Sequence, residues 1–84
     1  MVRVKFFATL RDITGRREIE VDNVNTVGDL LSVLYETYGE EFRREIEGKN
    51  MILVNGKNVL DLQGYETPLK DEDEVAIFPP VGGG

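Results

Sequence analysis

The sequence of 84 residues contains no cysteine and no histidine. Without cysteine there can be no disulfide, no zinc–thiolate or iron–sulfur site and no cysteine nucleophile. Without histidine the chain lacks the commonest general base and the commonest transition-metal ligand of proteins. Most familiar catalytic constellations are therefore excluded. We expect a chain that binds no metal or cofactor of its own and acts with partners rather than as a self-sufficient enzyme.

Basic residues are also few, since 10 Lys and Arg stand against 16 Asp and Glu and give a formal net charge of −6. This balance disfavours nucleic acid as the main partner, because neutralising phosphates requires clustered cations. It suits a basic groove on another protein, and simple solubility explains it equally well. No apolar run approaches the ~20 residues of a membrane span and no signal-peptide core follows the start, so we expect a cytoplasmic protein.

Alternating apolar residues predict two strands near the N-terminus. The first run, Val2–Leu10, has Phe7 on one face and an apolar set on the other. That apolar set consists of Val2, Val4, Phe6, Ala8 and Leu10. Thr14-Gly15 is a turn signal and Glu18–Val21 alternates again, so the two strands are expected to form a hairpin.

The middle of the chain predicts one main helix over Val27–Tyr38, where apolar residues recur at helical spacing. Thr26 is expected to cap its N-terminus, with Asp29 completing an imperfect capping box, and Gly39 to end it. A shorter, charged helix is expected over Glu40–Glu47. The apolar anchors of this helix and the residue that ends it would be Phe42, Ile46 and Gly48.

The second half predicts three more strands. Met51–Val54 has the pattern of a buried strand, and Asn55-Gly56 is the strongest short hairpin signal, from which Lys57–Leu60 returns. Residues 61–70 are expected to be a loop, and Glu74–Phe78 the last strand. The side chains expected to plug the core from that loop are Leu62, Tyr65 and Leu69.

Two phenylalanines are predicted on the outer face of the sheet. If Val75 and Ile77 lie in the core, Phe78 points the opposite way, as Phe7 does. We expect these two rings to form a hydrophobic docking patch, because exposed aromatic clusters make good interface anchors. A small basic cluster in the first hairpin is explained equally well by a partner contact and by solvation; it consists of Arg11, Arg16 and Arg17.

The chain ends in Pro79-Pro80-Val81-Gly82-Gly83-Gly84. The prolines fix φ and donate no backbone hydrogen bond, while the glycines lack Cβ and can enter a narrow channel. Six extended residues reach roughly 20 Å at ~3.3 Å each. A frayed terminus or an expression remnant is the alternative, but the paired prolines favour a stiff arm that presents a carboxylate. We therefore divide the chain into a domain at residues 1–78 and an arm at 79–84.

At both ends the chain resembles the small subunit of molybdopterin synthase, of the MoaD type. The resemblance rests on Val4-Lys5-Phe6-Phe7-Ala8 and on the run from Asp73 to Gly83. That family belongs to the ubiquitin-like β-grasp sulfur carriers, with the thiamine-pathway carrier and the archaeal ubiquitin-like modifiers. It implies an α+β β-grasp fold, with a mixed five-stranded sheet packed on one main helix plus a short helix. Glu72 departs from the family's usual turn glycine, which is expected to change only local type I turn geometry, and Gly82 fills a variable position.

The resemblance also implies a function as a sulfur carrier. An adenylating enzyme of the ubiquitin-activating type would use ATP to adenylate Gly84, and attack by sulfur would leave a thiocarboxylate there. The arm would then enter the large synthase subunit and donate sulfur to the dithiolene of the molybdenum or tungsten cofactor. Gly83 and Gly84 would supply clearance and the reactive group. The residues that would contact partners are Phe7, Phe78, Pro79, Pro80, Val81 and Gly82.

Three other functions stay open on the sequence. The same activated Gly84 carboxylate could form isopeptide bonds with lysines of target proteins, as in a ubiquitin-like modifier. The thiocarboxylate could instead serve thiamine synthesis or tRNA thiolation. An adaptor domain with an idle tail is also permitted, since a fold does not determine a function.

Overall fold

The computed structural model describes residues 1–47 and 50–79. These described residues form five strands, three α-helices and two short 3₁₀ helices. Their bounds are β1 Val2–Phe6, α1 Thr9–Thr14, β2 Glu18–Val21, α2 Val27–Tyr38, α3 Glu40–Ile46, β3 Met51–Val54, β4 Lys57–Asn58, η1 Val59–Asp61, η2 Gly64–Glu66 and β5 Glu74–Phe78.

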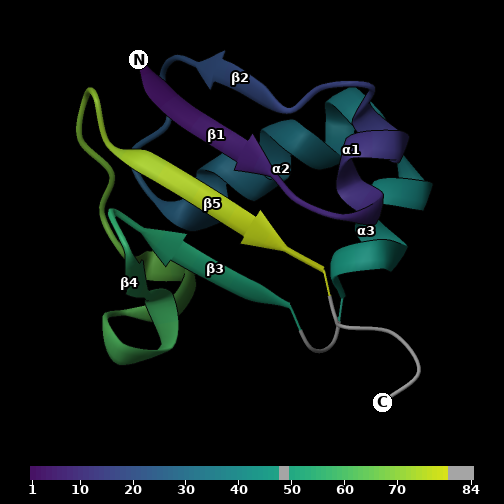
Figure 1. The fold of residues 1–84 in the computed structure, drawn as a ribbon. Helices are drawn as coiled ribbons and strands as arrows, with labels where there is room; N and C mark the ends of the chain where they lie inside the picture. Colours follow the sequence, from purple (N-terminus) through teal and green to yellow (C-terminus); the bar gives the residue numbers. More distant parts are fainter. Residues whose placement is uncertain (48–49, 80–84) are drawn as a thin grey trace.

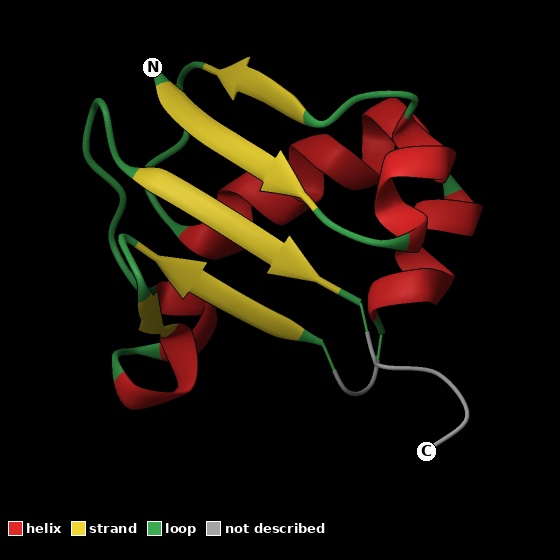
Figure 2. Cartoon of the chain, in the orientation of Figure 1, coloured by secondary structure: helices red, strands yellow, loops and turns green. Residues whose placement is uncertain are grey.

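The strands form one mixed sheet in the order β2-β1-β5-β3-β4. The central pair β1 and β5 is parallel, and the other three pairs are antiparallel. The helix α2 crosses behind the sheet while the opposite face of the sheet stays uncovered by helices (Figure 1). Figure 2 shows the same arrangement, with α2 behind the strands and the other two α-helices beside their right-hand ends. The expected mixed sheet packed on one main helix is confirmed, with α1 as an additional helix.

The core lies between the sheet and the helices. Strand β1 buries every second residue and β5 does the same with Val75 and Ile77, as their alternation predicts. Phe42 of α3 packs edge-on against Phe6 of β1, with ring centroids 5.8 Å apart. Burying each such large apolar side chain stabilises the fold by about 1.5–3 kcal/mol. This cluster therefore fixes α3 against the sheet.

The first predicted strand is too long. It ends at Phe6, and Thr9–Thr14 forms the helix α1 instead of a hairpin turn. The chain leaves the sheet at Ala8, whose φ of 54° and ψ of −131° are sparsely populated for a residue with a Cβ. Leu10 is buried, but from a helix, and Ala8 is exposed. Apolar residues at positions 6 and 10 suit a strand or a helix, so the alternation could not decide.

Strand β2 still pairs antiparallel with β1, as the predicted hairpin requires, with Val4 opposite Ile19. Gly15 closes α1 in the left-handed conformation at φ 71°, and its N–H donates to the carbonyl of Arg11 at 2.9 Å. The turn signal at Thr14-Gly15 was therefore correct in position. What it ends is a helix rather than a strand.

The predicted ends of α2 are confirmed. The hydroxyl of Thr26 accepts the N–H of Asp29 at 3.1 Å, and the Asp29 carboxylate accepts the N–H of Asn25 at 3.0 Å. The capping box thus reaches one residue further back than the standard one. Gly39, at φ 81°, ends the helix. Helix α3 ends at Ile46, one residue earlier than predicted; Gly48, which was expected to end it, lies outside the described residues.

The segment after β4 differs most from the prediction. β4 stops at Asn58, whose side chain accepts the N–H of Leu60 at 2.9 Å and so starts η1. Leu69 is buried as expected, but Leu62 and Tyr65 are 41% and 56% exposed, so the prediction that they plug the core is wrong. Leu60, expected in a strand, is 80% exposed. The 3₁₀ turns carry these three side chains outward.

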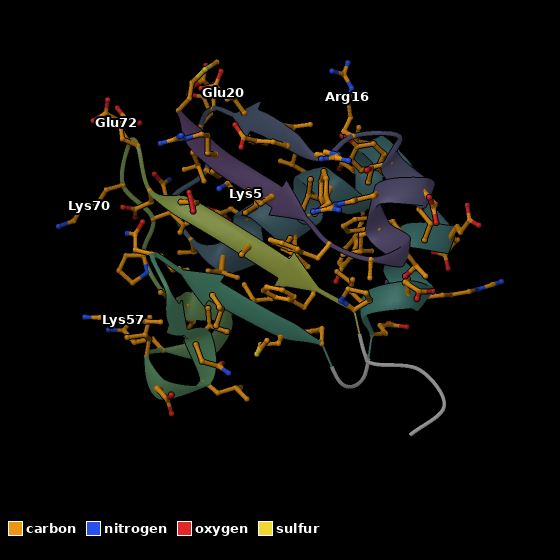
Figure 3. All side chains as sticks on the ribbon, viewed as in Figure 1. Lys5, Arg16, Glu20, Lys57, Lys70 and Glu72 are labelled. Atoms are coloured by element: carbon orange, nitrogen blue, oxygen red, sulfur yellow. The ribbon has the colours of Figure 1, made fainter. Side chains whose placement is uncertain are left out.

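Glu72, which stands where the resembled family usually has glycine, lies in the turn before β5. The N–H of Asp73 donates to the carbonyl of Lys70 at 3.1 Å, and Glu72, third in this turn, has φ 71°. A positive φ at the third position belongs to a type II turn, which favours glycine, so the expected type I geometry is wrong. Figure 3 shows Glu72 at the tip of this loop.

Among residues 1–47 and 50–79, no helix is both long and apolar enough to cross a membrane.

Candidate partner-docking face

The two phenylalanines singled out in the sequence stack on each other at the ends of β1 and β5. Their ring centroids are 4.2 Å apart and their planes differ by 11°. The parallel register puts Phe6 opposite Ile77, so the next residue of each chain segment also comes side by side. Both rings are half-buried. The parallel pairing of the first and last strands is therefore what builds this stack.

Arg11 of α1 lies over the Phe7 ring of the stack. Its Cζ lies 5.3 Å from the centre of the Phe7 ring, and its Nε donates to the Phe6 carbonyl at 3.0 Å. Such a contact contributes about 0.5–1 kcal/mol at an exposed site. Arg16, by contrast, points outward beyond this part of the molecule (Figure 3). The sequence showed the basic residues but could not separate these two roles, because α1 was not foreseen.

Apolar side chains of β3 and β5 extend the stack across the uncovered face of the sheet. Met51 lies opposite Phe78, and Leu53 lies opposite Ala76. Met51 is 42% exposed, and Leu53 and Ala76 are half-buried. The sequence prediction treated Met51–Val54 as a wholly buried strand and missed these residues. The rule that side chains alternate across a one-sided sheet would have found them.

Charged residues border this apolar strip. Lys5 of β1 pairs with Glu74 of β5 at 3.4 Å, and each side chain is about two-fifths exposed. An ion pair this exposed contributes little stability, roughly 0–1 kcal/mol. An apolar centre with a charged rim is the usual anatomy of a protein–protein interface. We define the docking face as Phe7, Arg11, Met51, Leu53, Ala76 and Phe78.

Pro79 is the last described residue and is buried directly after the stack. The structure therefore places the first proline of the predicted arm against the domain. The remaining arm residues predicted as functional lie outside the described residues; they are Pro80, Val81, Gly82, Gly83 and Gly84.

Residues 1–47 and 50–79 contain no group of three or more carboxylates arranged to hold a metal ion. Burial raises the pKa of Tyr35, helped by the nearby Tyr65 and Glu47 and opposed by Arg43. Tyr35 packs beside Phe42, with ring centroids 6.2 Å apart, rather than at the docking face.

A family model described as the ThiS family matches residues 4–84. The chain belongs to the ThiS family. This ThiS-family chain is 40% identical over 90 residues to small archaeal modifier protein 3 of Haloferax volcanii, covering 99% of this chain and 98% of the relative. It is 34% identical over 85 residues to the molybdopterin synthase sulfur carrier subunit of Escherichia coli K12, covering all of both chains.

The ThiS-family chain also resembles a solved structure over its whole length. The solution structure of small archaeal modifier protein 1 from Methanosarcina acetivorans superposes with a TM-score of 0.87 at 38% identity, covering 99% of this chain and 95% of that one. These similarities confirm the ubiquitin-like β-grasp fold and the resemblance to sulfur carriers. The chain is a small ubiquitin-like protein of the sulfur-carrier type.

Proposed function

We propose that this chain is the sulfur-carrier subunit of a molybdopterin synthase. The observation that carries the proposal is the Phe7–Phe78 stack, set at the ends of β1 and β5 directly before the Pro79-Pro80-Val81 sequence. An aromatic anchor beside a slim glycine terminus suits a subunit that docks by its sheet face and inserts its end. Full-length similarity to a relative named as a sulfur carrier subunit supports this function.

The proposed chemistry takes place on the carboxylate of Gly84. A carboxylate is a poor electrophile, so a partner of the ubiquitin-activating type uses ATP to form the acyl-adenylate and releases pyrophosphate. A sulfur nucleophile then displaces AMP, and the resulting thiocarboxylate donates its sulfur for the dithiolene of the molybdenum or tungsten cofactor. The chain itself binds no cofactor, since ATP is bound by the activating partner. Gly83 has no Cβ and leaves clearance in a narrow channel.

The described residues supply the docking step. Truncating a central aromatic anchor of an interface commonly costs ~1–3 kcal/mol of binding. Phe7 and Phe78 fill that role, with Arg11 holding the Phe7 ring in place. The partners that we propose for this face are the large synthase subunit and the adenylating enzyme, both in the cytoplasm. Nucleic acid is not among them.

Conjugation to proteins is the second candidate function. It is favoured by the 40% identity to small archaeal modifier protein 3, which exceeds the identity to the Escherichia coli sulfur carrier subunit. The same acyl-adenylate would then be attacked by a lysine amine of a target protein, giving an isopeptide bond. Transfer of sulfur to thiamine or to tRNA has no observation of its own to favour it.

The intact mass of the chain isolated from its native host separates the two functions. A sulfur carrier should show a population in which one sulfur replaces one oxygen, and incubation with the large subunit and the pterin precursor should remove it. Deleting Gly84 should abolish that transfer and leave the melting temperature unchanged. Lysine conjugates with no thiocarboxylate would replace the proposal with the modifier function.

A further inference from the structure

A second exposed apolar cluster lies on the two 3₁₀ turns, away from the docking face. Leu60 of η1, Leu62 between the turns and Tyr65 of η2 are all exposed, and we call these three residues the η cluster. Isolated exposed leucines need no explanation, but large apolar side chains gathered within six residues on one surface segment are typical of interaction sites.

Leu60 and Tyr65 border a hollow of about 310 Å³. The hollow is also lined by Ile52 of β3, Val59 of η1, Asn50 and Asn58. This volume stands at the bottom of the ~300–1,000 Å³ range of small-molecule sites. It therefore suits one or two apolar side chains of a protein segment better than a cofactor.

The segment that carries the cluster is fixed to the domain by hydrogen bonds. The buried Thr67 donates its hydroxyl to the Gly64 carbonyl at 2.7 Å and accepts the N–H of Gln63 at 3.1 Å. The Thr67 carbonyl also accepts the N–H of Val27, the first residue of α2, at 3.0 Å. A preformed surface loses little conformational entropy on binding. The exposure of the η cluster is thus a property of the folded domain.

The charges of this segment select the kind of partner. Residues 58–69 include two carboxylates, Asp61 and Glu66, and no lysine or arginine. Two lysines flank the segment, Lys57 and Lys70, and both line a separate hollow with Leu62 and Gln63 rather than the hollow beside Leu60 and Tyr65. Lys57 points outward from β4 (Figure 3). A second copy of this chain, with a net charge of −6, would meet repulsion here. A basic segment would be attracted.

We propose that the η cluster is a second protein-docking site, which takes an apolar side chain of a partner segment flanked by lysine or arginine. The apolar side chain enters the hollow between Leu60 and Tyr65, and the basic flanks pair with Asp61 and Glu66. This site goes beyond the proposed sulfur transfer, because neither the arm nor the Phe7–Phe78 stack takes part in it.

The two sites lie at different edges of the molecule. The η cluster follows β4, the outermost strand on one side of the sheet, whereas the stack lies where the two central strands end. Figure 1 shows the green segment after β4 and the C-terminal end of β5 at opposite sides of the lower part of the view. A partner segment held at the η cluster therefore leaves the Phe7–Phe78 stack free for a second protein.

The test uses the full-length ¹⁵N-labelled chain and a short synthetic peptide with a central phenylalanine flanked by lysine and arginine. Titration should shift the amide resonances of residues 59–66 in a saturable way, and Leu60→Ser with Tyr65→Ser should raise Kd about tenfold or more. The Kd should also rise with salt, because the basic flanks are attracted electrostatically. The same peptide with glycine at the centre should lose most of the affinity.

Two controls make the experiment decisive. Val33→Ser removes an exposed apolar side chain of α2 and should leave Kd unchanged, and the melting temperature of every variant reports its folding. Shifts confined to the Phe7–Phe78 stack, no saturable binding, or equal affinity of the glycine peptide would each overturn the proposal. So would a concentration-dependent dimer in sedimentation equilibrium that Leu60→Ser abolishes, because the occupant would then be a second copy.

Discussion

The docking face and the η cluster expose apolar side chains in different ways. Phe7 and Phe78 are half-buried and cover each other, whereas Leu60 and Tyr65 project from 3₁₀ turns into solvent. The first arrangement follows from the strand register together with a phenylalanine at each of the two positions that the register brings side by side. The second depends on a local turn built by Asn58 and Thr67. Strand register thus positions the stack, whereas a local turn exposes the η cluster.

The largest expected effect concerns the docking face. Phe7→Ala and Phe78→Ala should each weaken binding of the large synthase subunit by ~1–3 kcal/mol, because each removes an aromatic anchor. Isothermal titration calorimetry gives the affinity. Val33→Ala, on an exposed part of α2, is the matched control and should bind like the unaltered chain. If both phenylalanine variants bound the large subunit with unchanged affinity, Phe7 and Phe78 would not be anchors of an interface.

The next effect concerns the scaffold under the η cluster. Thr67→Val should lower the free energy of unfolding by roughly 1–2 kcal/mol, because the Gly64 carbonyl and the Gln63 N–H lose a buried partner. Urea unfolding measures it. Thr37→Val, at an exposed hydroxyl on α2, should change stability much less. If the two variants were equal, the η segment would not be the fixed surface that its hydrogen bonds indicate.

A third change acts beside Phe7. Ala8→Gly should stabilise the fold by about 1 kcal/mol, since the relief of strain at φ 54° exceeds the extra entropy that glycine loses. The expected readout is a higher melting temperature with an unaltered stack. A lower melting temperature would mean that the Ala8 methyl contributes contacts that outweigh its strained backbone.

The smallest effect is on the η cluster itself. Leu60→Ser should change the free energy of unfolding by no more than about 0.5 kcal/mol, because this side chain is almost fully exposed. Thermal unfolding followed by circular dichroism measures the difference. A loss comparable with that of Thr67→Val would place Leu60 in the structural part of the segment and leave no separate binding role for it.

The sequence predicted the sheet, the main helix and the stacked pair because their signals are local and redundant. Val75 and Ile77 alternate as they should, and Thr26 and Gly39 bound α2 as caps do. The sequence could not predict α1. The strained backbone of Ala8 turns the chain out of the sheet at a point where the alternation of apolar residues in the sequence continues. The positive φ of Glu72 was missed for a similar reason, since a single residue out of its preferred region leaves no periodic trace.

The residues of the candidate site also fall into a predicted group and a group that the sequence could not predict. The pairing of Phe7 with Phe78 was foreseen from two strands, whereas the place of Arg11 over the Phe7 ring depended on the unforeseen helix. Leu62 and Tyr65 were misplaced because a loop leucine or tyrosine has the same composition signal whether it fills a core or faces solvent. In the structure, side-chain hydrogen bonds of Asn58 and Thr67 shape the turns that expose Leu62 and Tyr65. Hydrogen bonds of this kind leave no periodic pattern in the sequence.

The central position of β5 has a mechanical consequence. A force applied to the C-terminal end pulls on a strand that is hydrogen-bonded on both sides, in parallel to β1 and antiparallel to β3. Such a load shears two ladders at once instead of peeling one edge strand. Under the proposed function, the C-terminal arm would be withdrawn from a partner's channel after each reaction, and the load would fall on a strand held by ladders on both sides.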